Sequence, residues 1–257
     1  MELNLNCDLG EKSKFYDGRN DKRLLKIVNT ANIACGYHAG NKSIILETIN
    51  ISKSNNVSIG AHPGFRDKKN FGRKRMNLSE KEIYKIVIEQ LEIISTIASK
   101  KNYQITHVKP HGALNNIACE NLNIAKIIGM AIKNFNRDLI YMILPLTKMQ
   151  KAANLLNMKH ACEIFADRNY TDVGFLIDRK YKNALITNIN TSIDNIKSML
   201  DNKAIKSING KYIKTDIDTI CIHGDGINSV SIAKKIKEGL IDNGIKLLPL
   251  NQLSKFQ

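Results

Sequence analysis

Short strand-like runs alternate with segments of helical periodicity along nearly the whole chain, and this alternation most constrains the fold. The runs that favour strands are 2–8, 32–36, 58–62, 105–110, 139–145, 160–166, 218–224 and 246–250. Helical spacing of apolar residues covers 21–31, 42–55, 80–100, 122–135, 147–157, 192–202 and 228–242. Strands that alternate with helices predict a parallel sheet with helical crossovers.

Seven or eight such units in 257 residues predict a single β/α barrel domain over residues 1–257. An open doubly wound sheet is less favoured, because no G-x-G-x-x-G sequence follows the first strand run. Ser79 and Glu82 form a capping-box pattern before the longest helix, and an Asn-Gly pair predicts a hairpin over 206–215.

The formal net charge of +15 raises the question of a nucleic-acid partner. The basic residues are spread along the chain, and aromatic residues make up only 6%, so we expect a solvated basic surface and no nucleic-acid binding.

No apolar run approaches about 20 residues, so no membrane-spanning helix is expected. Five cysteines without a C-x-x-C pair argue against a disulfide framework or zinc ribbon and favour a reducing, cytoplasmic compartment.

Four of the six histidines lie within two residues of a glycine at the end of a predicted strand. They are His38, His62, His111 and His223. The carboxyl ends of the strands in a β/α barrel meet at one mouth, so these imidazoles are expected at a shared site. His107 and His160 lie at the starts or in the bodies of strands, and we interpret both as structural.

Charged residues join the histidines at the same strand ends. They are Asp8, Glu11, Lys109, Asp167, Arg168 and Asp225. A cation, several imidazoles and several carboxylates at one rim predict acid–base catalysis. Other interpretations stay open: Asp225 as a helix N-cap, Asp167 and Arg168 as a buried ion pair, and Gly36 and Gly112 as simple turn residues.

The loop 63–77 is unusually long and carries Arg73 and Arg75 next to Gly72. A solvated basic turn is one interpretation. The other is a phosphate-binding segment or a lid that closes over substrate, since arginine binds phosphate through two parallel hydrogen bonds.

Several motifs follow one another in the order found in the LamB/YcsF family, which the chain resembles from about residue 2 to about residue 250. They are NLNCDLGE, ANIACGYHAG, GAHPGFRD with FGRKRM, VKPHGAL, EIFADRNY and CIHGD. The resemblance implies a seven-stranded barrel like that of the glycoside hydrolase/deacetylase superfamily. It also implies ATP-driven opening of 5-oxo-L-proline (pyroglutamate) to L-glutamate, in a complex with 5-oxoprolinase B and C subunits.

On that basis Lys109, Arg168 and Arg73 or Arg75 are candidates to stabilise phosphate charge, with Mg²⁺ brought in by ATP. The histidines are candidate bases, oriented by Asp8, Asp167 or Asp225. Gly36 and Gly112 are candidates for close backbone contact with a ligand.

Two alternatives have different chemistry. A metal-dependent amidase or carbohydrate deacetylase could hold one divalent ion between Asp8, His38 and His62. A non-catalytic subunit would only present substrate to its partners.

Overall fold

Seven parallel strands form a closed barrel in this computed structural model, which describes residues 1–224 and 228–257. The barrel strands are β1 (Glu2–Leu9), β2 (Thr30–Ala34), β3 (Ser58–His62), β4 (Ile105–Val108), β5 (Ile140–Ile143), β6 (His160–Phe165) and β9 (Thr219–His223). Neighbours along the chain pair in order from β1 to β6, then β6 pairs with β9, and β9 pairs with β1 to close the barrel. The predicted seven-stranded barrel is thereby confirmed.

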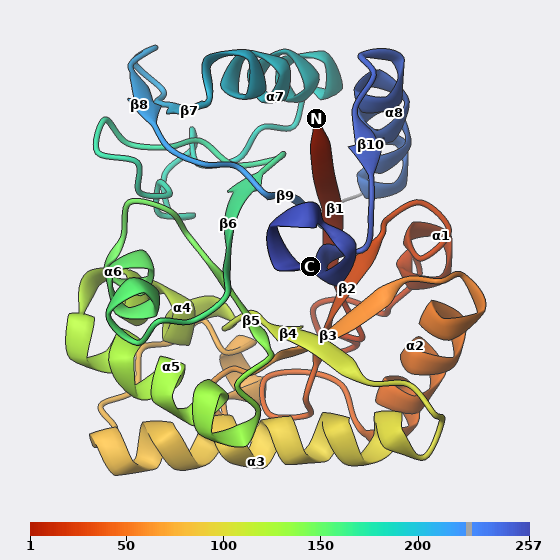
Figure 1. The fold of residues 1–257 in the computed structure, drawn as a ribbon, viewed down its shortest axis with the longest axis vertical. Helices are drawn as coiled ribbons and strands as arrows, with labels where there is room; N and C mark the ends of the chain where they lie inside the picture. The colour runs from red at the N-terminus through yellow and green to blue at the C-terminus, as the bar shows by residue number, and fades with distance from the viewer. Residues whose placement is uncertain (225–227) are drawn as a thin grey trace.

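Helices surround the barrel on its outer side, as Figure 1 shows. They are α1 (Asp21–Leu24), α2 (Lys42–Ser54), α3 (Glu80–Ser99), α4 (Gly112–Glu120), α5 (Leu122–Phe135), α6 (Lys148–Leu155), α7 (Ile189–Asn202) and α8 (Ser229–Asp242). The predicted capping box is present, because the Ser79 side chain accepts from the Glu82 backbone while the Glu82 carboxylate accepts from the Ser79 backbone. Short 3₁₀ turns lie at η1 (Lys68–Asn70), η2 (Leu250–Gln252) and η3 (Ser254–Phe256).

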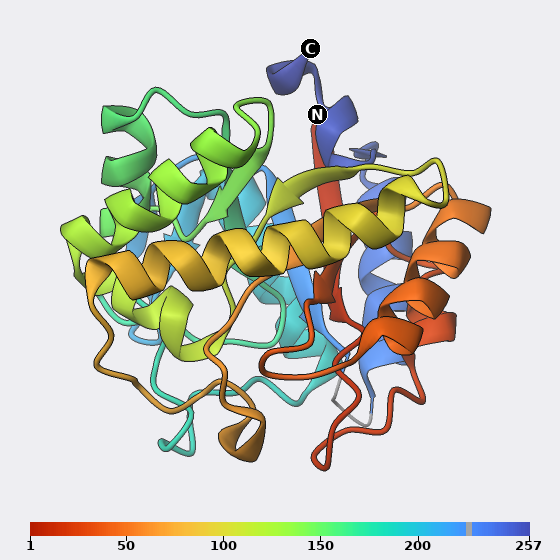
Figure 2. The ribbon, with the colours of Figure 1, turned by 90° about the horizontal axis from the view of Figure 1, so that it is seen from below.

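The C-terminal segment closes one end of the barrel. β10 (Lys246–Leu247) pairs with the first residues of β1, so the run predicted at 246–250 joins the sheet without becoming a barrel strand. Leu250, Leu253 and Phe256 then pack on Ile140 and Met142. In Figure 2 both chain termini lie at this end, and the long loops gather at the opposite end. The open mouth is therefore at the carboxyl ends of the strands.

The helix predicted over 21–31 is wrong in its second half. α1 ends at Leu24, and Thr30 already belongs to β2, where it pairs with Asn6 on one side and Ser58 on the other. The apolar spacing of this stretch fits a helix, but pairing with two neighbouring strands decides its conformation. The predicted Asn-Gly hairpin is confirmed as β7 (Ala204–Lys206) paired antiparallel with β8 (Tyr212–Lys214).

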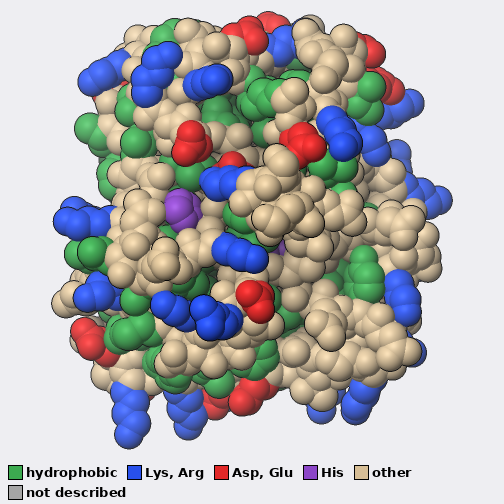
Figure 3. Space-filling view, viewed as in Figure 1, with side chains coloured by type: hydrophobic (Ala, Val, Ile, Leu, Met, Phe, Trp, Pro, Cys, Tyr) green, Lys and Arg blue, Asp and Glu red, His purple; other side chains and the backbone are tan. Residues whose placement is uncertain are grey.

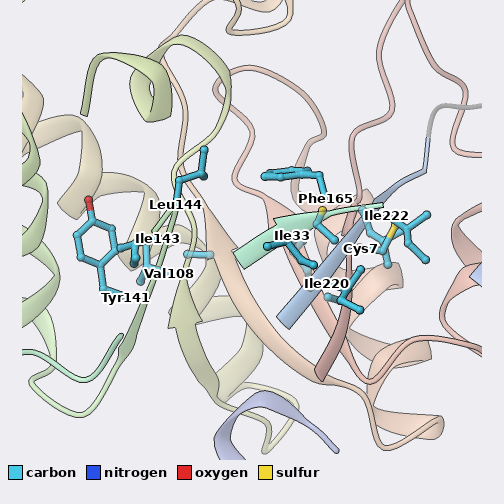
Figure 4. Close-up of a cluster of buried hydrophobic side chains, with 14 of the residues drawn as sticks. Cys7, Ile33, Val108, Tyr141, Ile143, Leu144, Phe165, Ile220 and Ile222 are labelled. Carbon is cyan, nitrogen blue, oxygen red and sulfur yellow. The ribbon is translucent and has the colours of Figure 1, made fainter. Parts of the chain in front are cut away.

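The strand side chains alternate between an apolar outer layer and a polar interior. In β1, Leu3, Leu5 and Cys7 belong to the hydrophobic core, while Asn4 and Asn6 are buried among polar partners from other strands. Figure 4 shows side chains of the apolar layer, including those of Ile33, Val108 and Ile143. Such a layer against the helices is ordinary for a β/α barrel, whereas a polar interior is not, because these interiors are usually filled by branched apolar residues.

Candidate active site

A cavity of about 320 Å³ lies at the carboxyl ends of the strands. Its lining includes ten of the residues predicted from sequence, namely Asp8, Glu11, His62, Arg73, Arg75, Lys109, His111, Gly112, Arg168 and His223. Within the described part of the chain, Gly36, His38 and Asp167 are not part of this lining. Asp225 lies outside the described residues. Most of the predicted site residues, which follow different strands, therefore lie around one cavity, as expected.

Lys109 lines the cavity and follows β4 directly. Its Nζ lies 2.8 Å from Asp8 Oδ1 and 2.9 Å from Glu163 Oε1, and its side chain is only 5% exposed. Burial favours a neutral lysine, but the charges of Asp8 and Glu163 outweigh it and raise the pKa of Lys109 well above its usual value. Burial likewise acts to raise the pKa of Asp8, yet the charges of His62 and Lys109 hold it well below its usual range. The pair is therefore ionised.

Hydrogen bonds from inside the barrel fix the Asp8 carboxylate. Asn32 Nδ2 donates to Asp8 Oδ1 at 2.7 Å, and Asn32 Oδ1 accepts from His107 Nε2 at 2.8 Å. Burial and the charge of Lys109 lower the pKa of His107 to about 3, so this ring is neutral. A methyl group on Gly60 would come within 2.3 Å of the His107 ring, so only glycine leaves it room. His107 is therefore structural, as predicted.

Three imidazoles converge on the Glu11 carboxylate. His38 Nε2 and His111 Nδ1 each lie 3.2 Å from Glu11 Oε1, and His62 Nε2 lies 3.7 Å from it. Burial and the neighbouring His111 lower the pKa of His38 to about 3, so His38 donates to Glu11 as a neutral ring. Burial acts to raise the pKa of Glu11, but hydrogen bonds from His111 and His38 hold it well below its usual value.

His62 and His111 hold a proton between them. His62 Nδ1 donates to the carbonyl oxygen of Lys109 at 2.7 Å, and His111 Nε2 donates to that of Phe71 at 2.9 Å. Their remaining nitrogens face each other at 3.0 Å, so one ring must carry a second proton. Burial opposes a charge on His62, but the Asp8 carboxylate outweighs burial and raises the pKa of His62. The second proton is therefore shared by His62 Nε2 and His111 Nδ1, both of which face the Glu11 carboxylate.

One cluster of possible metal ligands is present among the described residues. It consists of Glu11, His38, His62 and His111, whose ligand atoms lie within 4.8 Å of one another. The rings of His38 and His111 are stacked 3.8 Å apart at an angle of 4°. Because nitrogen lone pairs lie in the ring planes, two such rings cannot both point at one ion. The nitrogens of His62 and His111 are also closer than the separation of about 3.4 Å expected in a tetrahedral zinc site. The cluster therefore fits a shared proton better than a tetrahedral zinc ion.

The metal set predicted from sequence does not fit either. Asp8 Oδ1 is occupied by the Lys109 ammonium, a cation that stands where an ion would have to bind. His38 Nε2 is already bound to Glu11. These contacts do not favour the metal-dependent amidase or deacetylase alternative.

His223, which lines the cavity, forms a separate pair with Asp167. His223 Nδ1 lies 2.8 and 2.9 Å from the two carboxylate oxygens of Asp167, and the His223 ring stacks on Phe165. Burial acts to raise the pKa of Asp167, but His223 outweighs it and lowers that pKa. Asp167 therefore pairs with His223 and not with Arg168, whose guanidinium donates to the carbonyl oxygens of Ile177 and Ala184.

Arginines supply positive charge to the outer part of the cavity. Arg168 is buried, and burial together with the charge of Arg179 lowers its pKa to about 10. Arg75 pairs with Glu120 at 2.6 Å, and the Arg73 guanidinium lies 4.8 Å from the centre of the Phe71 ring. A concentration of guanidinium groups in a concave site favours an anionic ligand.

The two predicted glycines differ in role. Gly112 has a φ of +53°, and a Cβ there would come within 2.7 Å of the Gly72 carbonyl oxygen, so the 63–77 loop packs directly on it. Gly36 has a φ of +89°, with no described atom within 4 Å of a Cβ there, and donates its N–H to the Ala39 carbonyl oxygen. Gly112 shapes the cavity wall, whereas Gly36 is a turn residue.

Sequence reasoning missed Glu163, Asn6 and Asn32. Asn6 Nδ2 donates to Glu163 Oε1 at 3.1 Å, which links the barrel interior to the carboxylate that binds Lys109. A signal was present for Glu163, because it is the only charged side chain in the run ACEIF. Asn6 stands at a two-residue spacing from Asp8, which places both on the same face of β1.

A sequence model of the LamB/YcsF family matches residues 3–255. This chain belongs to the LamB/YcsF family. It is 43% identical to the 5-oxoprolinase A subunit of Staphylococcus epidermidis, over 97% of this chain and 99% of that protein. It is 39% identical to a 5-oxoprolinase A subunit, numbered 2, of Bradyrhizobium diazoefficiens, over 97% of this chain and 98% of the relative.

Solved structures agree on the fold of this LamB/YcsF member. A lactam utilization protein from Thermus thermophilus superposes with a TM-score of 0.90 at 32% identity, covering 96% of this chain and 99% of that one. The peptidoglycan deacetylase PdaC of Bacillus subtilis superposes with a TM-score of 0.53 at 16% identity, covering 99% of this chain and 90% of that one. The second likeness concerns the fold alone, and it agrees with the predicted deacetylase-like barrel.

Proposed function

We propose that this chain is the A component of a 5-oxoprolinase, a hydrolase that opens the cyclic amide of 5-oxo-L-proline to give L-glutamate. The observation that carries the proposal is the near-complete match, at 43% identity, to a protein of that name. The cavity supports it independently, because a buried lysine, two ionised carboxylates and several imidazoles line a concave site. These are the groups that amide hydrolysis requires.

ATP is the proposed co-substrate, with Mg²⁺. A five-membered lactam is an amide and reacts slowly with water at neutral pH. Transfer of a phosphoryl group to the lactam oxygen makes the ring carbon more electrophilic and turns that oxygen into part of a leaving group. The overall reaction then joins 5-oxoproline, ATP and water and yields glutamate, ADP and phosphate. Lys109 and the buried Arg168 are the residues of this chain best placed to stabilise the added negative charge.

The proposed complex contains B and C subunits, in keeping with the word "subunit" in the names of the relatives. No helix among the described residues is long and apolar enough to span a membrane. On the face seen in Figure 3, Lys and Arg side chains are spread among acidic and neutral ones. The absence of a nucleic-acid partner stays a prediction. A cytoplasmic location stays a prediction.

The test combines this purified chain with B and C subunits and measures glutamate and phosphate release from 5-oxoproline. We expect glutamate only when ATP and Mg²⁺ are present, and its absence from the complete mixture would contradict the proposal. Lys109→Ala and His111→Ala should each lower kcat by about 10²-fold or more if the site is catalytic. Lys151→Ala, an exposed position in α6, is the matched control. Full turnover by the two site variants would favour a protein that only presents substrate to its partners.

A further inference from the structure

The imidazoles of the cavity differ in whether a ring nitrogen is free to act on a ligand. His62 uses Nδ1 on the Lys109 carbonyl oxygen and Nε2 on His111 and Asp8. His111 uses Nε2 on the Phe71 carbonyl oxygen and Nδ1 on His62 and Glu11. Both rings are therefore committed to the protein.

His223 is the exception among the described histidines that line the cavity. Its Nδ1 is bound to Asp167, and its Nε2 makes no hydrogen bond to any residue that the structure describes. The side chain is 15% exposed, against 2% for His62 and 8% for His111. A carboxylate on Nδ1 fixes the tautomer with the proton on that nitrogen and leaves the lone pair on Nε2.

The inner carboxylates of the cavity are not free to accept a proton either. Asp8 is bound by Lys109 and Asn32, and Glu11 by His38 and His111. Glu120 and Asp178 line the outer part, where they are exposed and paired with Arg75 and Lys180. Among the described residues, His223 is thus the inner group whose proton-accepting atom is unoccupied.

We infer that His223 is the general base that activates water for opening of the lactam ring, with Asp167 as its positioning residue. This inference rests on the proposed function. In the ring whose oxygen carries the phosphoryl group from ATP, His223 Nε2 takes a proton from water as the water oxygen bonds to the ring carbon. The carbon–nitrogen bond then breaks with its electrons on nitrogen, which takes that proton from His223 and the second proton of the water, so an amine and an acyl phosphate form. A second water splits the acyl phosphate into the glutamate carboxylate and phosphate, and His223 is back in its starting state.

The surroundings of His223 suit this role. Phe165 holds the ring by stacking, and Lys109 Nζ lies 5.0 Å from the centre of the same Phe165 ring, so the proposed base and the cation that would stabilise an oxyanion share one wall. Asp8 is the register partner of His223 on β1. The described charges nearby are Asp167, which binds His223, and Asp8 and Lys109, with Arg168 and Arg179 acting on Asp167.

The experiment compares His223→Asn and Asp167→Asn with the wild-type chain in the complete complex with its B and C subunits. We expect His223→Asn to lower kcat by about 10²–10⁴-fold with little change in KM. The acid limb of the kcat/KM profile, where protonation of the base removes activity, should flatten in this variant. Asp167→Asn should lower kcat and shift that limb, and Asp167→Glu should restore part of the activity. His160→Asn, at the start of β6 away from the cavity, is the control and should stay within about twofold.

The outcomes separate the two claims. If the wild-type complex makes no glutamate, both the proposed function and the role of His223 are overturned. If the wild-type complex is active and His223→Asn keeps more than about a fifth of its kcat with an unchanged acid limb, only the role of His223 is overturned. Circular dichroism checks that the variant is folded. If His223→Asn fails to fold, Asp167→Asn decides the question through the position of its acid limb.

Discussion

Replacement of Lys109 by methionine should destabilise the protein strongly. The side chain is 5% exposed, and its ammonium lies close to two carboxylate oxygens, at 2.8 and 2.9 Å. Removal of one partner from a buried ion pair costs about 3–5 kcal/mol, because the remaining charge is left uncompensated in a medium of low dielectric constant. Methionine keeps most of the apolar volume, so a cavity contributes little. We therefore expect a loss of about 3–5 kcal/mol in the free energy of unfolding at pH 8.

This loss should depend on pH in a defined direction. In the wild type, His62 and Lys109 outweigh burial and hold the pKa of Asp8 low, so the stabilisation is complete above the unfolded value of about 3.9 and is lost only as pH falls through the folded value. In the variant, Glu163 loses the Lys109 charge that opposes its burial, so its pKa, which burial already raises, moves further upward and folding takes up a proton as pH falls. The difference between the two proteins should be largest at pH 8 and shrink toward pH 5.

Urea unfolding followed by circular dichroism between pH 5 and pH 8 measures this difference directly. Lys151→Met, an exposed lysine in α6, is the control and should change stability by less than about 0.5 kcal/mol. A loss below about 1 kcal/mol for Lys109→Met, or a loss that does not change with pH, would refute the argument that Lys109 neutralises buried carboxylates.

Two further predictions concern the cavity wall and the ligand. Gly112→Ala should cost about 1–3 kcal/mol of stability, because its φ is +53° and its Cβ would meet the Gly72 carbonyl oxygen at 2.7 Å. Thermal melting measures this loss, and Gly239→Ala inside α8, with no described atom within 4 Å of the new methyl group, should instead be neutral or stabilising. Arg168→Gln should raise the KM for 5-oxoproline about tenfold or more with a smaller effect on kcat, as steady-state kinetics of the complex would show. An unchanged KM would exclude this guanidinium from substrate binding.

The order of strands and helices could be predicted from sequence because it depends on local patterns. Ser79 and Glu82 specify where α3 begins, and the Asn-Gly pair specifies the turn between β7 and β8. The segment 21–31 shows where local pattern fails, since sheet pairing overrides its helical periodicity. The location of the site could be predicted for a related reason: the residues after parallel strands meet at one end, whatever their partners are.

The partners within the site could not be predicted, because they depend on which strands are neighbours across the barrel. Lys109 and Glu163 lie 54 positions apart in the numbering, yet their side chains are 2.9 Å apart. The division of roles between the histidines has the same origin. His38, His62, His111 and His223 look alike in sequence, and only the contacts of each ring nitrogen distinguish them.

The polar interior explains why those contacts are so specific. A strand buried on both faces in a parallel barrel usually reads as a continuous apolar run. In β1 the alternation of Asn4, Asn6 and Asp8 with apolar residues breaks that rule, and each of the three finds a partner: Asn4 accepts from Thr219, Asn6 donates to Glu163, and Asp8 accepts from Lys109. A buried network whose members are all satisfied holds its side chains in one arrangement. The network therefore holds Asp8 and Lys109 in a fixed ion pair. Proton transfer is left to a residue outside the network, and His223 is such a residue.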